Sequence, residues 1–141
     1  MSGFLLDTNC ISEAMRLHPE PRVVAWLEAA DESLLFLSVL TFGEIRKGVA
    51  ALAGGRRRAK LEQWLDVELR ARFSGRILPI DEEIADRWGV LAASATKRGK
   101  ALSAIDGLIA ATAVHHNLTI VTRDDGDFSE MPVPVVNPWE A

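Results

Sequence analysis

In the segment Phe4-Leu5-Leu6-Asp7-Thr8-Asn9, three apolar residues lead directly into a carboxylate and two small polar side chains. A short apolar run of this kind is typical of a buried β-strand. In a parallel sheet both faces are covered, and functional groups collect just beyond the carboxyl ends of the strands. Asp7 is therefore expected at a functional sheet edge, although it could also simply cap the segment that follows it.

Working outward from this stretch, apolar runs alternate with helical patterns. The expected strands are 4–6, 35–39, 76–80, 118–121 and 133–136. The expected helices are 23–30, 41–52, a longer one after the glycines at 54 and 55, one capped by Asp81, and 104–116. In the longer helix, the spacing of Leu61, Trp64, Leu65, Leu69 and Phe73 indicates one buried face. Short apolar strands separated by helices predict an α/β fold with a mostly parallel sheet of four or five strands flanked by helices.

The length of 141 residues predicts a single domain over residues 1–141. The lone cysteine excludes an internal disulfide, and no export signal or bilayer-length apolar run is visible, so we expect a cytoplasmic protein without membrane contact. The net charge of −4 does not favour a polyanionic partner. Any nucleic acid must therefore be attracted by a local basic patch or by bound cations.

Acidic residues stand at several junctions between the expected elements. Asp7 follows the first strand, and Glu44 falls in the first turn of the helix after the second strand. Asp106 opens the 104–116 helix, and either Asp124 or Asp127 follows the 118–121 strand. If the first and fourth strands are neighbours, these carboxylates converge on one edge of the sheet.

Each of these residues also has a purely structural explanation. The Thr41–Glu44 segment has the form of a capping box, the Ser103–Asp106 segment is a looser version of it, and 124–127 is a turn-forming sequence. Helical phase also counts against Glu44, which lies off the apolar face of its helix. Taken singly, only Asp7 favours a functional role over a structural one.

Taken together, the carboxylates favour a cation site. Like charges brought close would repel and raise one another's pKa values, and a divalent cation would remove that penalty. Mg²⁺, with Mn²⁺ as an alternative, prefers such all-oxygen sites. His18, His115 and His116 are poorly distributed for zinc, and Cys10 has no sulfur partner.

Four segments together resemble a known family. They are LLDTNCISE (5–13), TFGEIRKGVA (41–50), DGLIAATAVHHNLTIVTRD (106–124) and VVNPW (135–139). Their order and content are similar to those of the PIN-domain ribonucleases of the VapC/FitB type, the toxin halves of bacterial type II toxin–antitoxin pairs. The resemblance extends over nearly the whole chain and implies the PIN-domain fold.

The resemblance also implies the site. Its acidic residues fall on Asp7, Glu44, Asp106 and Asp124, which would act as catalytic groups and as ligands of Mg²⁺ or Mn²⁺. Small polar residues of the pocket fall on Thr8, Asn9 and Thr122. Many relatives carry an Asn where this chain has Asp124, so Asp127 is kept as the alternative fourth acid.

By the same resemblance, the expected activity is metal-dependent hydrolysis of RNA phosphodiester bonds, with tRNA among the candidate substrates. The expected partners are a VapB-like antitoxin that inhibits the toxin, a second toxin copy or a dimer of toxin–antitoxin dimers, and operator DNA bound through the antitoxin. Arg46, Arg57 and Arg58 are candidate contacts for RNA or antitoxin, although a solvated basic turn is the favoured explanation of this cluster. The alternative function is a catalytically weak PIN-fold module that acts by binding the antitoxin and, through it, operator DNA.

Overall fold

The computed structural model describes residues 3–100 and 102–140, whose five strands form one parallel sheet in the order β3-β2-β1-β4-β5. The central strand, β1 (Phe4–Leu6), lies between β2 (Leu35–Ser38) and β4 (Thr119–Val121). The edges are β3 (Ile77–Leu78) and β5 (Val135–Val136). The predicted parallel α/β sheet is thus confirmed, and the first and fourth strands are neighbours, which is the condition for the carboxylates to meet at one edge.

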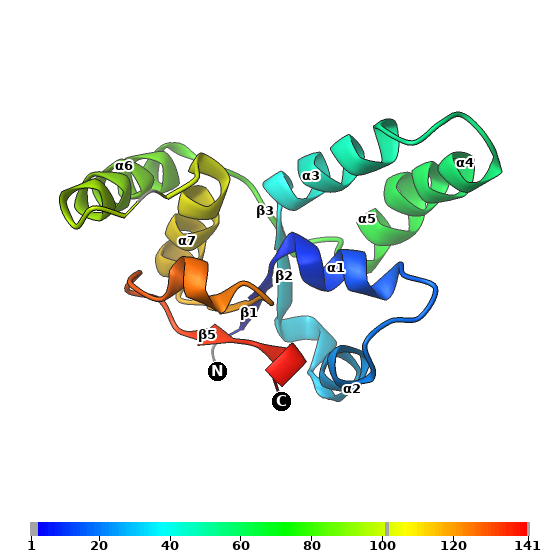
Figure 1. Cartoon of the computed structure of the whole chain (residues 1–141), viewed down its shortest axis with the longest axis horizontal. Coiled ribbons are helices and arrows are strands. Elements are labelled where there is room, and N and C mark those ends of the chain that lie inside the picture. The colour runs from blue at the N-terminus through cyan, green and yellow to red at the C-terminus, as the bar shows by residue number, and fades with distance from the viewer. Residues whose placement is uncertain (1–2, 101, 141) are drawn as a thin grey trace.

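Helices cover both faces of this sheet, with α1 to α5 on one side and α6 and α7 on the other (Figure 1). Their bounds are α1 (Thr8–Ala14), α2 (Pro21–Ala29), α3 (Val39–Ala50), α4 (Arg56–Gln63), α5 (Arg70–Arg72), α6 (Glu82–Lys97) and α7 (Ala104–His116). None of the helices within the described residues is long and apolar enough to cross a bilayer.

Two hydrophobic cores result, because neighbouring residues of a strand point to opposite faces of the sheet. Leu6 on β1 packs into the core beneath α1, α3 and the 64–73 segment, whereas the adjacent Leu5 packs into the core beneath α6 and α7. Both leucines are essentially inaccessible to solvent. This burial fixes the register of β1 and, with it, the position of Asp7 at the carboxyl edge of the sheet.

The helix after β2 begins earlier than predicted. Ser38, rather than Thr41, caps α3, and its hydroxyl accepts a 3.1 Å hydrogen bond from the Leu40 N–H. Thr41 is buried inside the helix, so the predicted Thr41–Glu44 capping box is wrong. Glu44 consequently lies beyond the first turn of α3, and its carboxylate is free for another partner.

Helix α1 was not predicted, whereas the predicted helices and strands are present with small shifts of their bounds. The 104–116 helix has the predicted bounds, and Asp81 caps α6 by accepting a 2.9 Å hydrogen bond from the Ile84 N–H. The predicted long helix after the glycines is one helical run, but its middle, Trp64–Leu69, is π-helical. Leu65, Leu69 and Phe73 are buried along it, as the spacing indicated.

Candidate functional site

Asp7 occupies the centre of the carboxyl edge of the sheet. It ends β1 and caps α1, with Oδ1 accepting a 2.8 Å hydrogen bond from the Thr8 N–H. Oδ2 accepts a 2.8 Å hydrogen bond from the hydroxyl of Thr122, which directly follows β4. Only 7% of Asp7 is exposed, so one hydrogen bond from the start of α1 and one from the end of β4 hold an almost buried carboxylate in one orientation.

Asn9 links α1 to the turn after β4. Its Nδ2 donates to the Thr122 hydroxyl oxygen and to Asp124 Oδ2, each at 3.2 Å. Its Oδ1 accepts from the Arg123 N–H at 3.3 Å, and the Asp124 N–H donates to the Thr122 hydroxyl oxygen at 3.0 Å. These contacts place the Asp124 carboxylate next to the residues that surround Asp7.

Glu44 reaches the same edge through Thr8, whose hydroxyl donates to Glu44 Oε1. The buried residues of α3 are on another face of the helix, as the sequence phase indicated. Because Glu44 does not lie on the buried face of α3, its side chain is half-exposed and directed toward α1. Thr8 and Asn9 are the two polar residues predicted to line the pocket beside Asp7. Thr8 therefore holds the carboxylate of Glu44, and Asn9 holds that of Asp124.

The first turn of α7 places Asp106 near the other carboxylates of the site. Ser103 caps this helix, and its hydroxyl accepts a 3.1 Å hydrogen bond from the Asp106 N–H, as the sequence predicted. The next residue, Gly107, lies so close to Trp88 of α6 that a Cβ there would come within 2.8 Å of the indole. The first turn of α7 is thus pressed against α6, which fixes where Asp106 stands.

The pKa values report the proximity of these carboxylates. Burial raises the pKa of Asp7, hydrogen bonds from Thr122 and Thr8 oppose the rise, and the charges of Asp106 and Glu44 add to it. Burial likewise raises the pKa of Asp106, with further contributions from the negative charges of Asp127, Glu44 and Asp124. Each carboxylate therefore lies within electrostatic range of several others.

Both candidates for the fourth acidic residue, Asp124 and Asp127, interact with the site. Asp124 is the one held by Asn9, whereas Asp127 exerts the largest charge effect on the pKa of Asp106. Both stand in or beside the 3₁₀ turn Asp125–Phe128, and both are exposed. The turn after β4 therefore presents two carboxylates toward the same site.

No positive side chain in the described ranges forms an ion pair with Asp7, Glu44 or Asp106. Arg123 approaches only Asp124, with Nε 3.9 Å from Oδ1. Within the part of the chain that the structure describes, Asp7, Glu44 and Asp106 thus have no ion-pairing partner, and their hard oxygen donors match the chemistry of Mg²⁺ or Mn²⁺. As the side chains stand, however, no three His, Cys, Asp or Glu residues of the described chain are grouped closely enough to hold a metal ion.

The basic residues predicted as RNA or antitoxin contacts differ in their availability. Arg46 pairs with Asp66. Arg58 donates to the Leu52 carbonyl oxygen at 3.2 Å and lies 3.4 Å from Glu62, so it holds the α3–α4 connection together. Arg57 is exposed.

A buried glutamate was not anticipated from the sequence. Glu13, on α1, is only 3% exposed, and its Oε2 accepts a 2.9 Å hydrogen bond from the Glu20 N–H. This bond, more than the nearby Arg16, lowers the pKa of Glu13. The only available signal was its place one helical turn after Asn9, which does not by itself distinguish a buried carboxylate from a solvated one.

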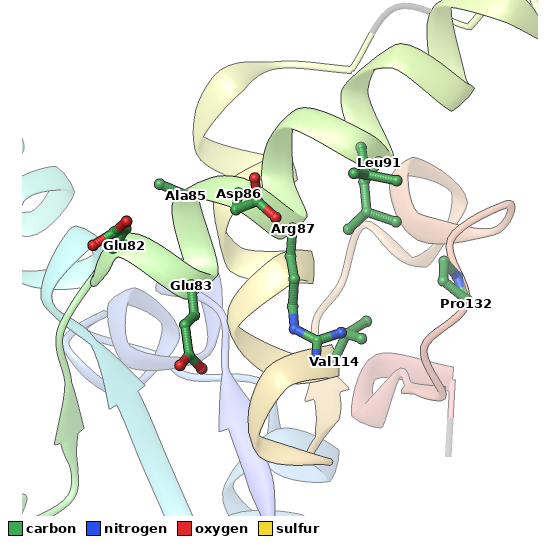
Figure 2. A pocket seen from close by; sticks show the side chains of 9 residues that line it. Glu82, Glu83, Ala85, Asp86, Arg87, Leu91, Val114 and Pro132 are labelled. Carbon is green, nitrogen blue, oxygen red and sulfur yellow. The ribbon is translucent and has the colours of Figure 1, made fainter.

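A separate cavity lies away from the acidic edge. It is an open groove of about 1070 Å³ formed by α6, the end of α7 and the segment at Pro132 (Figure 2). Its lining contains Glu82, Glu83, Ala85, Asp86, Arg87, Val90, Leu91, Val114 and Pro132. None of the candidate site residues belongs to it.

Comparison with known proteins agrees with this geometry. Residues 4–134 match the PIN domain family. The chain is 45% identical to "Toxin FitB" of Neisseria gonorrhoeae over 96% of this chain and 97% of FitB, and 39% identical to "VapC ribonuclease Y4jK" of Sinorhizobium fredii over 96% and 97%. The solved structure of FitAB bound to an IR36 DNA fragment superposes with a TM-score of 0.92 at 43% identity, covering 96% of this chain and 95% of that one. The chain therefore belongs to the PIN-domain family, in the branch that contains the toxin FitB and the VapC ribonucleases.

Proposed function

We propose that this protein is the toxin of a type II toxin–antitoxin pair and that it is a divalent-metal-dependent endoribonuclease. The observation that carries the proposal is the convergence of Asp7, Glu44 and Asp106. The charges of Asp106 and Glu44 both add to the raised pKa of Asp7, and none of the three forms an ion pair with a basic side chain among the described residues. Similarity over nearly the whole chain to a protein named as a toxin and to one named as a ribonuclease supports the same function.

In this proposal the chain's own residues act by position and charge. Asp7 is held in a single orientation by Thr122 and Thr8, and Asp106 faces it from the start of α7. These two carboxylates would be the principal ligands of a cation, with Glu44 and Asp124 completing the set or orienting the attacking water. Asp127 is the alternative fourth acid.

A bound Mg²⁺ or Mn²⁺ would lower the pKa of a coordinated water and neutralise charge on the phosphoryl oxygens of RNA. Glu44, Asp106 and Asp124 are all at least partly exposed, so their side chains can turn toward the fixed carboxylate of Asp7. This rotation is required because the described side chains do not already form a ligand group.

The partners follow from the relatives. We propose an antitoxin of the VapB kind as the inhibitor, operator DNA bound through that antitoxin, and toxin dimerisation within the complex. The FitAB–DNA structure supports the first two. We also propose that residues 1–141 are one PIN domain, because a single sheet organises both cores and the family match spans 4–134. We propose the cytoplasm as its location.

The direct test is cleavage of structured RNA by antitoxin-free protein with and without Mg²⁺ or Mn²⁺, beside Asp7→Asn. Cleavage by the wild type only with the cation, and its loss in Asp7→Asn, would support the proposal. Equal cleavage by both proteins would indicate a contaminating nuclease and would leave the antitoxin-binding module as the better description.

A further inference from the structure

The side-chain amide of Asn137, just after β5, clamps the turn that carries Asp124. Its Nδ2 donates to the Arg123 carbonyl oxygen at 3.0 Å and to Asp125 Oδ1 at 3.3 Å. Its Oδ1 accepts from the Trp139 N–H at 2.9 Å. One amide thus joins the residues on both sides of Asp124 to the C-terminal segment.

This segment is itself well anchored. The Thr122 N–H donates to the Val136 carbonyl oxygen at 3.0 Å, which continues the β4–β5 ladder into the turn. The Trp139 ring packs against the core beneath α1. The guanidinium carbon of Arg123 lies over this ring, 5.8 Å from the ring centroid. A hydrogen bond from Trp139 also contributes to lowering the pKa of the buried Glu13 on α1. The tail therefore connects the turn to the far end of the helix that begins at Asp7.

The turn needs such support because it is exposed and bears like charges. Arg123, Asp124 and Asp127 are all exposed, and Asn9 holds the turn from the α1 side only. Without the Asn137 amide, the Arg123 carbonyl and Asp125 would lose these bonds, and Asp124 would be held only by its contacts with Asn9 and Thr122. The backbone on both sides of Asp124 would then be less restrained, and its carboxylate would sample more positions. In an exposed loop, order of this kind comes from specific hydrogen bonds rather than from buried apolar area.

We propose that Asn137 is a positioning residue for the acidic site, one that never contacts RNA but fixes Asp124 through the turn at 123–125. The proposal rests on the proposed nuclease function for its kinetic consequences, but the clamp itself does not depend on it. Because a misplacement of about 1 Å can cost a catalytic site a large factor in rate, loss of the clamp lowers kcat on the order of tenfold while KM stays within about twofold.

The test compares Asn137→Ala with Asn117→Ala, both in the full chain. Asn117 ends α7 in the left-handed conformation at the opposite edge of the sheet, so its replacement imposes a comparable stability loss far from the turn. Asn137→Asp serves as a second variant if Asn137→Ala folds poorly, because it keeps the acceptor for Trp139 and loses the donors. The measurements are kcat and KM for RNA cleavage and backbone ¹⁵N order parameters at residues 123–125.

We expect Asn137→Ala to lower both kcat and the order parameters of the turn, and Asn117→Ala to change neither. Unchanged order parameters in both Asn137 variants, or an equal fall of kcat in Asn117→Ala, would overturn the proposal. If the wild type cleaves no RNA, the proposed function fails, and the order parameters alone decide whether Asn137 holds the turn.

Discussion

The hydroxyl of Thr122 donates a 2.8 Å hydrogen bond to Asp7 Oδ2, joining two residues that are 115 positions apart in the chain. The bond exists because β1 and β4 are parallel neighbours whose carboxyl ends meet at one edge of the sheet. It fixes the orientation of Asp7, which is the least exposed carboxylate of the acidic site.

Asp7→Asn should abolish RNA cleavage and yet raise the melting temperature in the absence of divalent cations. The pKa of Asp7 is higher in the folded chain than in the unfolded chain, so the folded state loses stability as the pH rises through that pKa. Removing the charge removes this cost, and we expect a gain of about 2–5 °C at neutral pH. Thermal unfolding in EDTA measures it, and a lower melting temperature than that of the wild type would contradict the expectation.

Thr122→Val should weaken cleavage strongly while leaving the sheet intact. The substitution nearly preserves volume but removes a donor to Asp7 and a bonding partner of both Asn9 and Asp124. Leaving such groups unpaired in a buried position costs about 1–3 kcal/mol. Thr119→Val, at the other end of β4, is the matched control. If both variants retain wild-type cleavage, Thr122 does not orient Asp7.

Gly107→Ala should reduce both stability and activity. A Cβ at this position would come within 2.8 Å of the Trp88 indole, so α7 must shift away from α6 at the turn that bears Asp106. Overpacking of this kind typically costs about 1–3 kcal/mol.

The matched control for this prediction is Gly89→Ala, which places the same methyl group in open space on α6 beside Trp88. This change should be neutral or stabilising, because alanine favours helix over glycine. Urea unfolding and RNA cleavage measure the pair, and equal stability of the two variants would show that the Trp88–Gly107 contact can relax without cost.

Glu13→Gln should destabilise the protein at neutral pH but not in acid. The pKa of Glu13 is lowered on folding, chiefly by the Glu20 N–H, so its charged form contributes stability above the unfolded pKa, and this contribution disappears as the pH falls through the folded pKa. We expect the melting temperature to drop by about 3–5 °C at pH 7. Melting curves from pH 7 down to pH 3 should converge for variant and wild type; a constant difference would show that packing, rather than charge, is responsible.

Much of the fold was open to prediction because its signals are local. The apolar run 4–6, the caps at Asp81 and Ser103, and the bounds of the 104–116 helix all depend on residues within one turn of each other. The helix after β2 was misplaced because Ser38 and Thr41 are both good capping residues, and only the end of the strand shows that Ser38 is the cap. Helix α1 was missed because its seven residues carry too short an apolar pattern.

Local patterns in the chain are therefore enough to predict the strands, most of the helices and the set of carboxylates at their junctions. How these carboxylates meet depends on contacts between elements that are distant in the chain. The Thr8 hydroxyl holds Glu44, and the Asn137 amide holds the 123–125 turn; each contact joins residues from different elements. The burial of Glu13 likewise depends on the packing of elements that are distant in the chain. The physical reason is that the strand order β2-β1-β4 sets distances between groups far apart in the chain, and no local propensity encodes such distances.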